Sequence, residues 1–161
     1  MKRLRVYNAR RLITETPTTV TPDESLEELV LAITEDPKTR SLFVVDGQKR
    51  LKGVITLKDI VRAIFSELTE MDLLGYSAVK ATLSRRASDL IEGDNFVCTK
   101  DEDTLESALT KMLDNGLEEI PVVDTDTRVI GELDLREMLI VWLEKMIKGK
   151  IVGDVGRGGD E

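Results

Sequence analysis

The chain contains two segments of similar sequence, and this internal repeat constrains the fold more than any other feature. The first segment begins at Ala9 and contains "SLEEL" and "FVVDGQKRLKGVITLKD". The second begins at Ala87 and contains "TLESAL" and "PVVDTDTRVIGELDLRE", with Gly131 in the place of Gly53. Self-similarity of this length and order indicates a duplicated unit whose two copies pack against each other.

Each copy is predicted to form a strand, a helix, a hairpin of two strands and a second helix. In the first copy, Ser25 and Glu28 fit a capping box at the start of a helix. Apolar runs over 42–46 and 51–56, separated by a polar turn, predict the hairpin. Residues 57–65 have helical periodicity. The second copy predicts elements over 97–99, 104–115, 120–124, 129–133 and 135 to about 147.

The predicted organisation has four parts. Residues 1–66 form an N-terminal segment and the first repeat, and residues 67–86 form a helical connection. The second repeat covers residues 87–147. The glycine-rich residues 148–161 are expected to be a mobile tail.

Composition excludes several classes of function. The net charge of −8 makes nucleic acid an unfavourable partner. With no histidine and one cysteine, Cys98, the chain cannot build the usual zinc sites or a Ser-His-Asp triad. No cluster of the remaining polar residues has catalytic spacing, so we expect no enzyme activity. The single cysteine and the absence of a signal-like or membrane-spanning apolar run favour a cytoplasmic location with no membrane partner.

A threonine and an aspartate stand where a predicted strand passes into a helix. These residues, Thr56 and Asp59, follow Gly53 in "GVITLKD". One interpretation is a helix cap. The other is a ligand site, because a carboxylate can accept hydrogen bonds from two sugar hydroxyls and a helix N-terminus offers free N–H groups to phosphate. The residues alone leave both interpretations open.

The ordered set of motifs, present twice, resembles a tandem of CBS (cystathionine-β-synthase) domains, also called a Bateman module. The resemblance rests on "TVTPDESLEEL", "SLFVVD" and "GVITLKD", with the echoes "CTKDEDTLESAL", "EIPVVD" and "GELDLRE". It implies an α/β (α+β) fold of two β-α-β-β-α repeats with pseudo-two-fold symmetry. It also implies a regulatory, non-catalytic module without a cofactor. Such a module binds an adenosyl ligand, AMP, ADP, ATP or S-adenosylmethionine, between its repeats.

The family pattern assigns ligand contacts mainly to the first repeat. Its G-x-x-[S/T]-x-x-[D/N] motif corresponds to Gly53, Thr56 and Asp59. Residues before the first and second strands of the repeat also approach the ligand in the family, although an ordinary surface role is an alternative for each. The resulting candidate binding residues are Pro17, Thr18, Thr39, Arg40, Ser41, Thr56, Lys58 and Asp59, with no metal ligand and no catalytic residue among them.

The second repeat departs from this pattern by carrying acids at four corresponding positions. They should repel a phosphate, so we expect a competent first pocket and a degraded second one. The acids can instead bind a cation such as Mg²⁺ or simply be solvated. Either cleft can also receive side chains from the other repeat, with Lys58 and Arg136 as candidates. The four acids are Glu118, Glu119, Asp134 and Glu137.

The last predicted helix carries a broad apolar surface that includes Trp142. A place in the core is one explanation, and a homodimer formed through helices, as is common in the resembled family, is the other. A purely structural oligomerisation module with vestigial pockets is therefore the alternative function. Because no effector domain accompanies the repeats in this sequence, we expect any signal to pass to another, unknown protein. The surface comprises Met138, Leu139, Val141, Trp142 and Met146.

Overall fold

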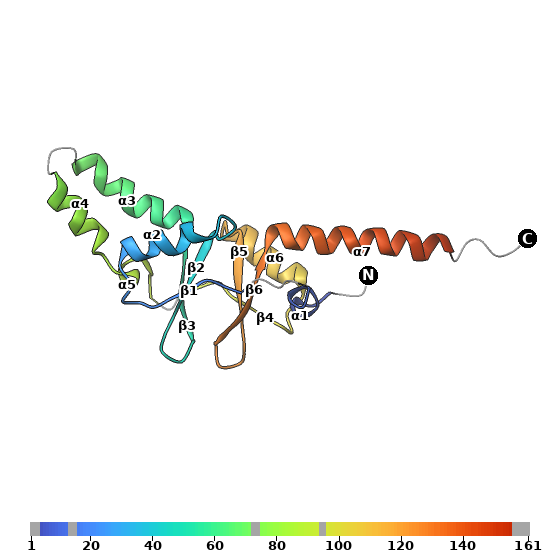
Figure 1. Ribbon diagram of the computed structural model, residues 1–161. Helices are drawn as coiled ribbons and strands as arrows, with labels where there is room; N and C mark the ends of the chain where they lie inside the picture. The colour runs from blue at the N-terminus through green and yellow to red at the C-terminus, as the bar shows by residue number, and fades with distance from the viewer. Residues whose placement is uncertain (1–3, 13–15, 72–74, 94–95, 156–161) are drawn as a thin grey trace, which may run out of the picture.

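The structure is a computed structural model that describes residues 4–12, 16–71, 75–93 and 96–155. It contains two three-stranded sheets (Figure 1). In each sheet the first two strands are parallel and the last two antiparallel, which makes both sheets mixed. The predicted α/β fold of two repeats is confirmed. The strands are β1 (Thr19–Val20), β2 (Ser41–Val45) and β3 (Leu51–Thr56), then β4 (Thr99–Lys100), β5 (Glu119–Val123) and β6 (Val129–Asp134).

The capping box predicted at the start of the first long helix is present, and the last helix extends beyond its predicted end. Ser25 and Glu28 form the predicted capping box, with the Ser25 N–H 2.9 Å from Glu28 Oε2. The last helix continues through residues 148–155, because no proline interrupts it; residues 156–161 of the expected mobile tail lie outside the described residues. The helices are α1 (Val6–Arg10), α2 (Leu26–Glu35), α3 (Leu57–Met71), α4 (Tyr76–Leu83), α5 (Ala87–Leu90), α6 (Leu105–Asp114) and α7 (Leu135–Val155).

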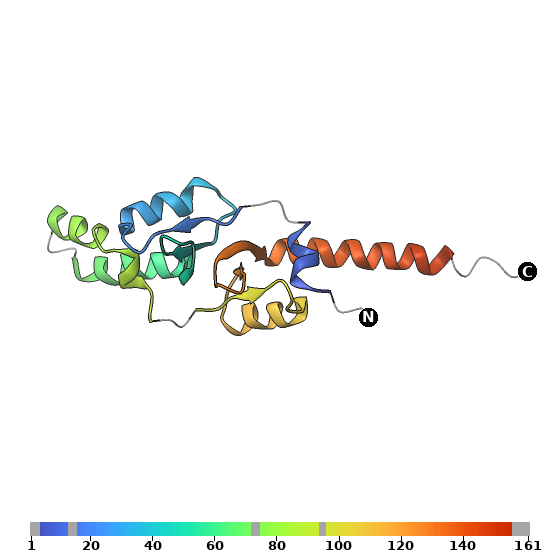
Figure 2. The ribbon, with the colours of Figure 1, turned by 90° about the horizontal axis from the view of Figure 1, so that it is seen from below.

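The two repeats exchange their short leading helices. The segment at α1 packs on the second repeat, where the Val6 N–H donates to Asp103 O at 2.9 Å. The segment at α5 packs on the first repeat, where the Ala87 N–H donates to Glu24 O at 2.8 Å. Figure 2 shows α1, in blue, beside the second repeat rather than the first. Residues grouped with one repeat by sequence therefore complete the core of the other.

Three apolar clusters form the core. One belongs to the second repeat and includes Val6 and Ala9 of α1, and one belongs to the first repeat and includes Ala87 of α5. The third lies between the sheets and is built on Phe43, Leu51 and Val123. This third cluster joins the two repeats into one body.

The two hairpins add hydrogen bonds to this boundary. The Leu51 N–H donates to Thr127 O at 2.8 Å, and the Val129 N–H donates to Lys49 O at 3.1 Å. Backbone pairing of this kind fixes the register of one sheet against the other. No helix in the described part of the chain is long and apolar enough to cross a bilayer.

Candidate functional site

Thr56 and Asp59 cap the first turn of α3 through two reciprocal hydrogen bonds. The Thr56 N–H donates to Asp59 Oδ2 at 2.9 Å, and the Asp59 N–H donates to Thr56 Oγ1 at 3.1 Å. This reciprocal pair is a capping box, which satisfies donors that the helix itself leaves unpaired. The helix-cap interpretation of these two residues is therefore correct. The capping box itself does not use Asp59 Oδ1 or the Thr56 hydroxyl proton.

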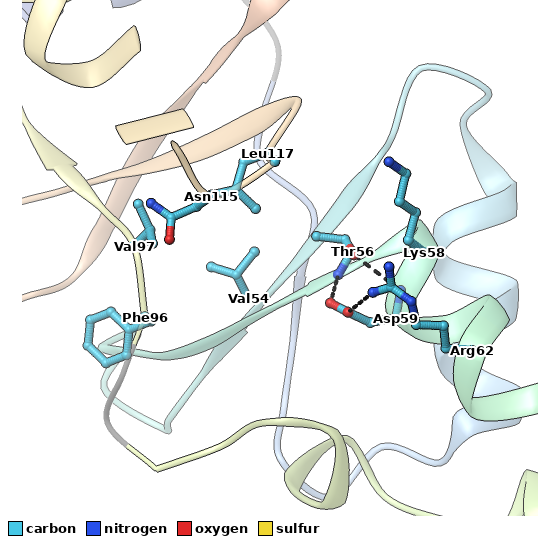
Figure 3. A pocket seen from close by; sticks show the side chains of 10 residues that line it. Val54, Thr56, Lys58, Asp59, Arg62, Phe96, Val97, Asn115 and Leu117 are labelled. Carbon is cyan, nitrogen blue, oxygen red and sulfur yellow. Dashed lines mark hydrogen bonds and ion pairs between the residues drawn. The ribbon is translucent and has the colours of Figure 1, made fainter. Parts of the chain in front are cut away.

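The same two residues also line a cavity of about 330 Å³ between the repeats. This volume is within the range that small-molecule sites occupy, roughly 300 to 1,000 Å³. One wall comes from the end of β3 and the start of α3, and the other comes from the second repeat (Figure 3). The lining residues are Val54, Thr56, Lys58, Asp59 and Arg62 from the first repeat, and Phe96, Val97, Asn115, Gly116 and Leu117 from the second.

The cavity has an apolar end. Figure 3 shows Val54 facing Phe96 and Val97, with Leu117 above them. Phe96 and Val54 also contact the apolar cluster between the sheets, which anchors this end of the cavity to the core. The loop at Gly116 reaches the cavity because that glycine has φ +63° and ends α6, as the Asn-Gly sequence predicts.

The other end of the cavity is polar and carries two cations. Arg62 Nη1 lies 3.6 Å from Asp59 Oδ1, one turn along α3. Lys58 lines the same end, and Figure 3 shows its chain directed away from the carboxylate of Asp59. The N-terminus of α3 adds the positive field of the helix dipole here. The end of the cavity therefore favours anionic groups near Lys58 and Arg62 and hydroxyl donors near Asp59.

Of the eight predicted binding residues, three line this cavity: Thr56, Lys58 and Asp59. The other five lie at the starts of β1 and β2, outside the lining. Thr18 Oγ1 and Thr39 Oγ1 are 3.5 Å apart, and Arg40 pairs with Glu118 at 3.5 Å. Pro17 is half-buried beside Thr18, and Ser41 is buried in the first position of β2.

The opposite wall of the cavity comes from positions in the second repeat that correspond to predicted positions in the first repeat. Val44 pairs with Gly53 in one sheet as Val122 pairs with Gly131 in the other, which aligns the two repeats residue by residue. In this alignment Phe96, Val97 and Leu117 are the counterparts of Pro17, Thr18 and Thr39. Because the repeats are related by a pseudo-two-fold axis, the start of helix α3 in the first repeat lies opposite the residues that precede strands β4 and β5 in the second. No single repeat carries that information in its sequence.

The acids of the second repeat are neither a cluster at a metal site nor all solvated. Glu119 is 4% exposed, and its two carboxylate oxygens accept the N–H groups of Arg40 at 3.0 Å and Ser41 at 2.8 Å. Burial raises the pKa of Glu119 to about 7, against the effect of these two donors. Asp134 Oδ1 accepts the N–H of Arg136 at 2.6 Å. Among the described residues, no group of three or more acidic or cysteine side chains could hold a metal ion.

Comparison with known proteins identifies the family. The model of the CBS domain matches the chain twice, over residues 9–66 and 87–144. The chain belongs to the CBS domain family. The two matches coincide with the two repeats, so the protein contains a CBS pair, also called a Bateman module.

The sequence also suggested that Arg136 of the second repeat could reach a ligand bound mainly by the first. Arg136 does not line the cavity.

Relatives of this CBS pair include an enzyme that contains a similar region. Inosine-5′-monophosphate dehydrogenase of Methanocaldococcus jannaschii is 30% identical over 134 residues, which are 83% of this chain and 23% of that protein. The chain thus spans about a quarter of the length of this relative. The similarity to the enzyme concerns that part only.

Solved structures share the fold over most of the chain. A CBS domain-containing protein from Thermotoga maritima, TM0935, has a TM-score of 0.72 and 27% identity, and the match covers 89% of this chain and 97% of that one. CBSX2, solved in complex with AMP, has a TM-score of 0.65 and 24% identity, with 88% and 97% coverage.

Proposed function

We propose that this CBS pair is a non-catalytic regulatory module that binds an adenine nucleotide, AMP, ADP or ATP, in the cavity between its repeats. The observation that carries the proposal is the division of the cavity into an apolar end and an end with one carboxylate and two cations. A nucleotide has the same division into a flat base, a sugar diol and phosphates. Binding produces a signal only if the ligand favours one geometry of the module over another.

Each part of the nucleotide has a partner of suitable chemistry. The base fits between Val54 and the apolar side chains of the second repeat, Phe96 and Val97. Oδ1 of Asp59 can accept a hydrogen bond from a ribose hydroxyl, and a charged acceptor makes the stronger bond. Lys58 and Arg62 can pair with phosphate oxygens.

The charge of the polar end favours phosphates over a sulfonium. S-adenosylmethionine carries a positive sulfur where a nucleotide carries its phosphates, and that charge would lie beside Lys58 and Arg62. The complex of the fold relative CBSX2 with AMP supports an adenosyl ligand, and the charge of the polar end is what favours a nucleotide within that class. Of the adenosyl ligands considered from the sequence, we therefore favour AMP, ADP and ATP.

Isothermal titration calorimetry of the purified protein with AMP, ATP and S-adenosylmethionine tests this proposal. We expect nucleotide binding that Asp59→Ala weakens about tenfold or more, since a charged hydrogen bond is lost. Asp89→Ala is the matched control, because Asp89 caps α5 through the Arg86 N–H as Asp59 caps α3, but away from the cavity. No heat with any nucleotide, or equal binding by Asp59→Ala, would refute the proposal.

We propose that the residues at the starts of β1 and β2 that the sequence predicts as ligand contacts bind a nucleotide more weakly than the cavity does. These residues are Pro17, Thr18, Thr39, Arg40 and Ser41. The N–H groups of those last two residues already donate to Glu119, which supports weaker binding there. A stoichiometry near one nucleotide per chain is the expected result.

A homodimer through helices is the second proposal, and it is also the basis of the alternative structural function. Its support is the apolar exposure of α3 and α7, where Phe65 is 60% exposed, Leu139 67% and Trp142 57%. Such a surface is larger than solitary exposed residues explain. Val141 and Met138 instead pack in the core of the second repeat. One part of the apolar surface of the last helix therefore belongs to the core, and the exposed part is the proposed dimer interface.

A further inference from the structure

The side chain of Glu119, in the second repeat, hydrogen-bonds to the backbone of the first repeat. It is the first residue of β5, yet its carboxylate accepts N–H groups at the start of β2, from Arg40 at Oε1 and from Ser41 at Oε2. Its counterpart in the first repeat is Ser41, whose short side chain cannot make the reciprocal reach. The link is therefore a feature of one side of the pseudo-two-fold axis.

The residues joined by these hydrogen bonds, Arg40 and Ser41 on one side and Glu119 on the other, are each close to one wall of the cavity. On the first-repeat side, the Arg40 carbonyl accepts the Leu57 N–H at 2.9 Å, and Ser41 pairs with Thr56 in the sheet. Thr56 lines the cavity, and Leu57 begins the helix that carries Lys58 and Asp59. On the second-repeat side, Leu117 lines the opposite wall two residues before Glu119. A change in the hydrogen bonds of Glu119 therefore reaches the first-repeat wall through one hydrogen bond or one strand pair, and the second-repeat wall through two residues of chain.

We propose that Glu119 is a positioning residue that sets the separation of the two cavity walls, so that its ionisation controls nucleotide affinity. This inference rests on the proposed nucleotide site and adds its regulation by pH. The ionised carboxylate accepts both N–H groups. A protonated carboxyl directs its own O–H toward one of them, so it holds only one donor well.

Burial raises the pKa of Glu119, and the charges around this residue partly oppose one another. Asp134 lies opposite in the antiparallel pair and disfavours a second negative charge, whereas Arg40 favours it. Glu118 offsets part of that attraction by pairing with Arg40 at 3.5 Å. Asp134 itself accepts the N–H groups of Arg136 and Glu137, at the start of α7. With burial as the largest cause, the pKa of Glu119 rises to about 7, so both forms are present in neutral solution.

Backbone NMR of the nucleotide-free protein tests the link directly. Between about pH 6 and pH 8, the amide signals of Arg40 and Ser41 should shift with a common midpoint near the pKa of Glu119. In Glu119→Gln, which cannot ionise, that transition should be absent. Glu118→Gln is the control and should retain it. Amides that do not titrate in wild type, or that titrate equally in Glu119→Gln, would overturn the inference.

AMP affinity tests the consequence for the site. At about pH 8, Glu119→Gln should bind AMP about tenfold more weakly than wild type, and the ratio should approach one at about pH 6. Comparing the two proteins at each pH cancels the titration of the phosphate itself. A ratio that is independent of pH would contradict the switch. If neither protein binds AMP, the proposed function fails, and the amide titration alone decides whether Glu119 links the repeats.

Discussion

Gly53 of β3 lies directly beneath Ile91, which follows the short helix α5 from the other repeat. A Cβ atom built on Gly53 would lie 2.6 Å from Ile91 Cγ2 and 3.0 Å from Ile91 Cβ. At the equivalent place in the second repeat, a Cβ on Gly131 would lie 2.5 Å from Arg10 Cδ. Gly53 thus permits the close approach of the exchanged segment to the hairpin, whereas the neighbour of Gly131 is the long side chain of Arg10, which can move aside.

Gly53→Ala should therefore destabilise the fold by about 1–3 kcal/mol, because the new methyl group would lie 3.0 Å from Ile91 Cβ, which is bonded to the backbone and cannot move aside alone. Gly47→Ala is the control, since nothing lies within 4 Å of the position where its Cβ would be. Urea unfolding followed by circular dichroism measures both. Equal stability of the two variants would show that the segment after α5 does not pack on β3.

Thr127→Gly should stabilise the protein by about 0.5–1 kcal/mol. Thr127 has φ 63° at the tip of the second hairpin, a left-handed conformation that is unfavourable for a β-branched residue. Glycine removes that strain, and its greater freedom in the unfolded chain offsets part of the gain. Thermal unfolding would show a higher midpoint for this variant, whereas a lower midpoint would contradict the strained geometry.

The sequence predicted the elements of this fold well because each repeat signals its own local structure. Ser25 with Glu28, and the Asn-Gly pair at Asn115, produce in the structure the helix cap and the helix end that they predict. The exchange of α1 and α5 was not predicted, because both are short helices whose partners lie in the other repeat. Their sequences do match between the repeats, for example at Ala9 and Ala87, both fully buried, but a match does not show which repeat each segment packs on.

The candidate site was only partly predictable for the same reason. Thr56 and Asp59 follow a local motif, so sequence reasoning reached one wall of the cavity. The opposite wall, at Phe96 and Leu117, depends on how the two repeats face each other, which no local pattern encodes. Glu119 was grouped with the other acids as a repulsive charge, because a hydrogen bond to a distant backbone has no sequence signature.

Lys58→Gln should weaken ATP binding about three- to tenfold while leaving adenosine binding unchanged, since it removes a charge that only phosphates require. The salt dependence of ATP affinity should fall as well. Lys52→Gln is the control, because Lys52 pairs with Asp46 at 3.9 Å and does not line the cavity. Calorimetry with both ligands at two salt concentrations measures the effect. An equal loss for adenosine would indicate a general disturbance of the site.

Glu119 should also make folding stability depend on pH. Its pKa in the folded protein is about 7, above the 4.5 of an unperturbed glutamate, so the folded state retains a proton that the unfolded state has lost. The stability from this group is fully present below the unfolded pKa and is lost as pH rises through the folded one. Glu119→Gln should show a smaller decline in unfolding free energy over that window than wild type or Glu118→Gln. Parallel declines in all three proteins would contradict the raised pKa.

Trp142→Glu should convert the proposed homodimer to a monomer. Trp142 is 57% exposed on α7, and a charge there would have to be buried without a partner if two copies joined through this helix. Leu113→Glu is the control, because Leu113 is 64% exposed on α6, outside the proposed face on α3 and α7. Light scattering after size-exclusion chromatography gives the mass of each protein. A dimer that survives Trp142→Glu but not Leu113→Glu would move the interface to α6, and a monomeric wild type would leave the exposed face of α7 to a different partner.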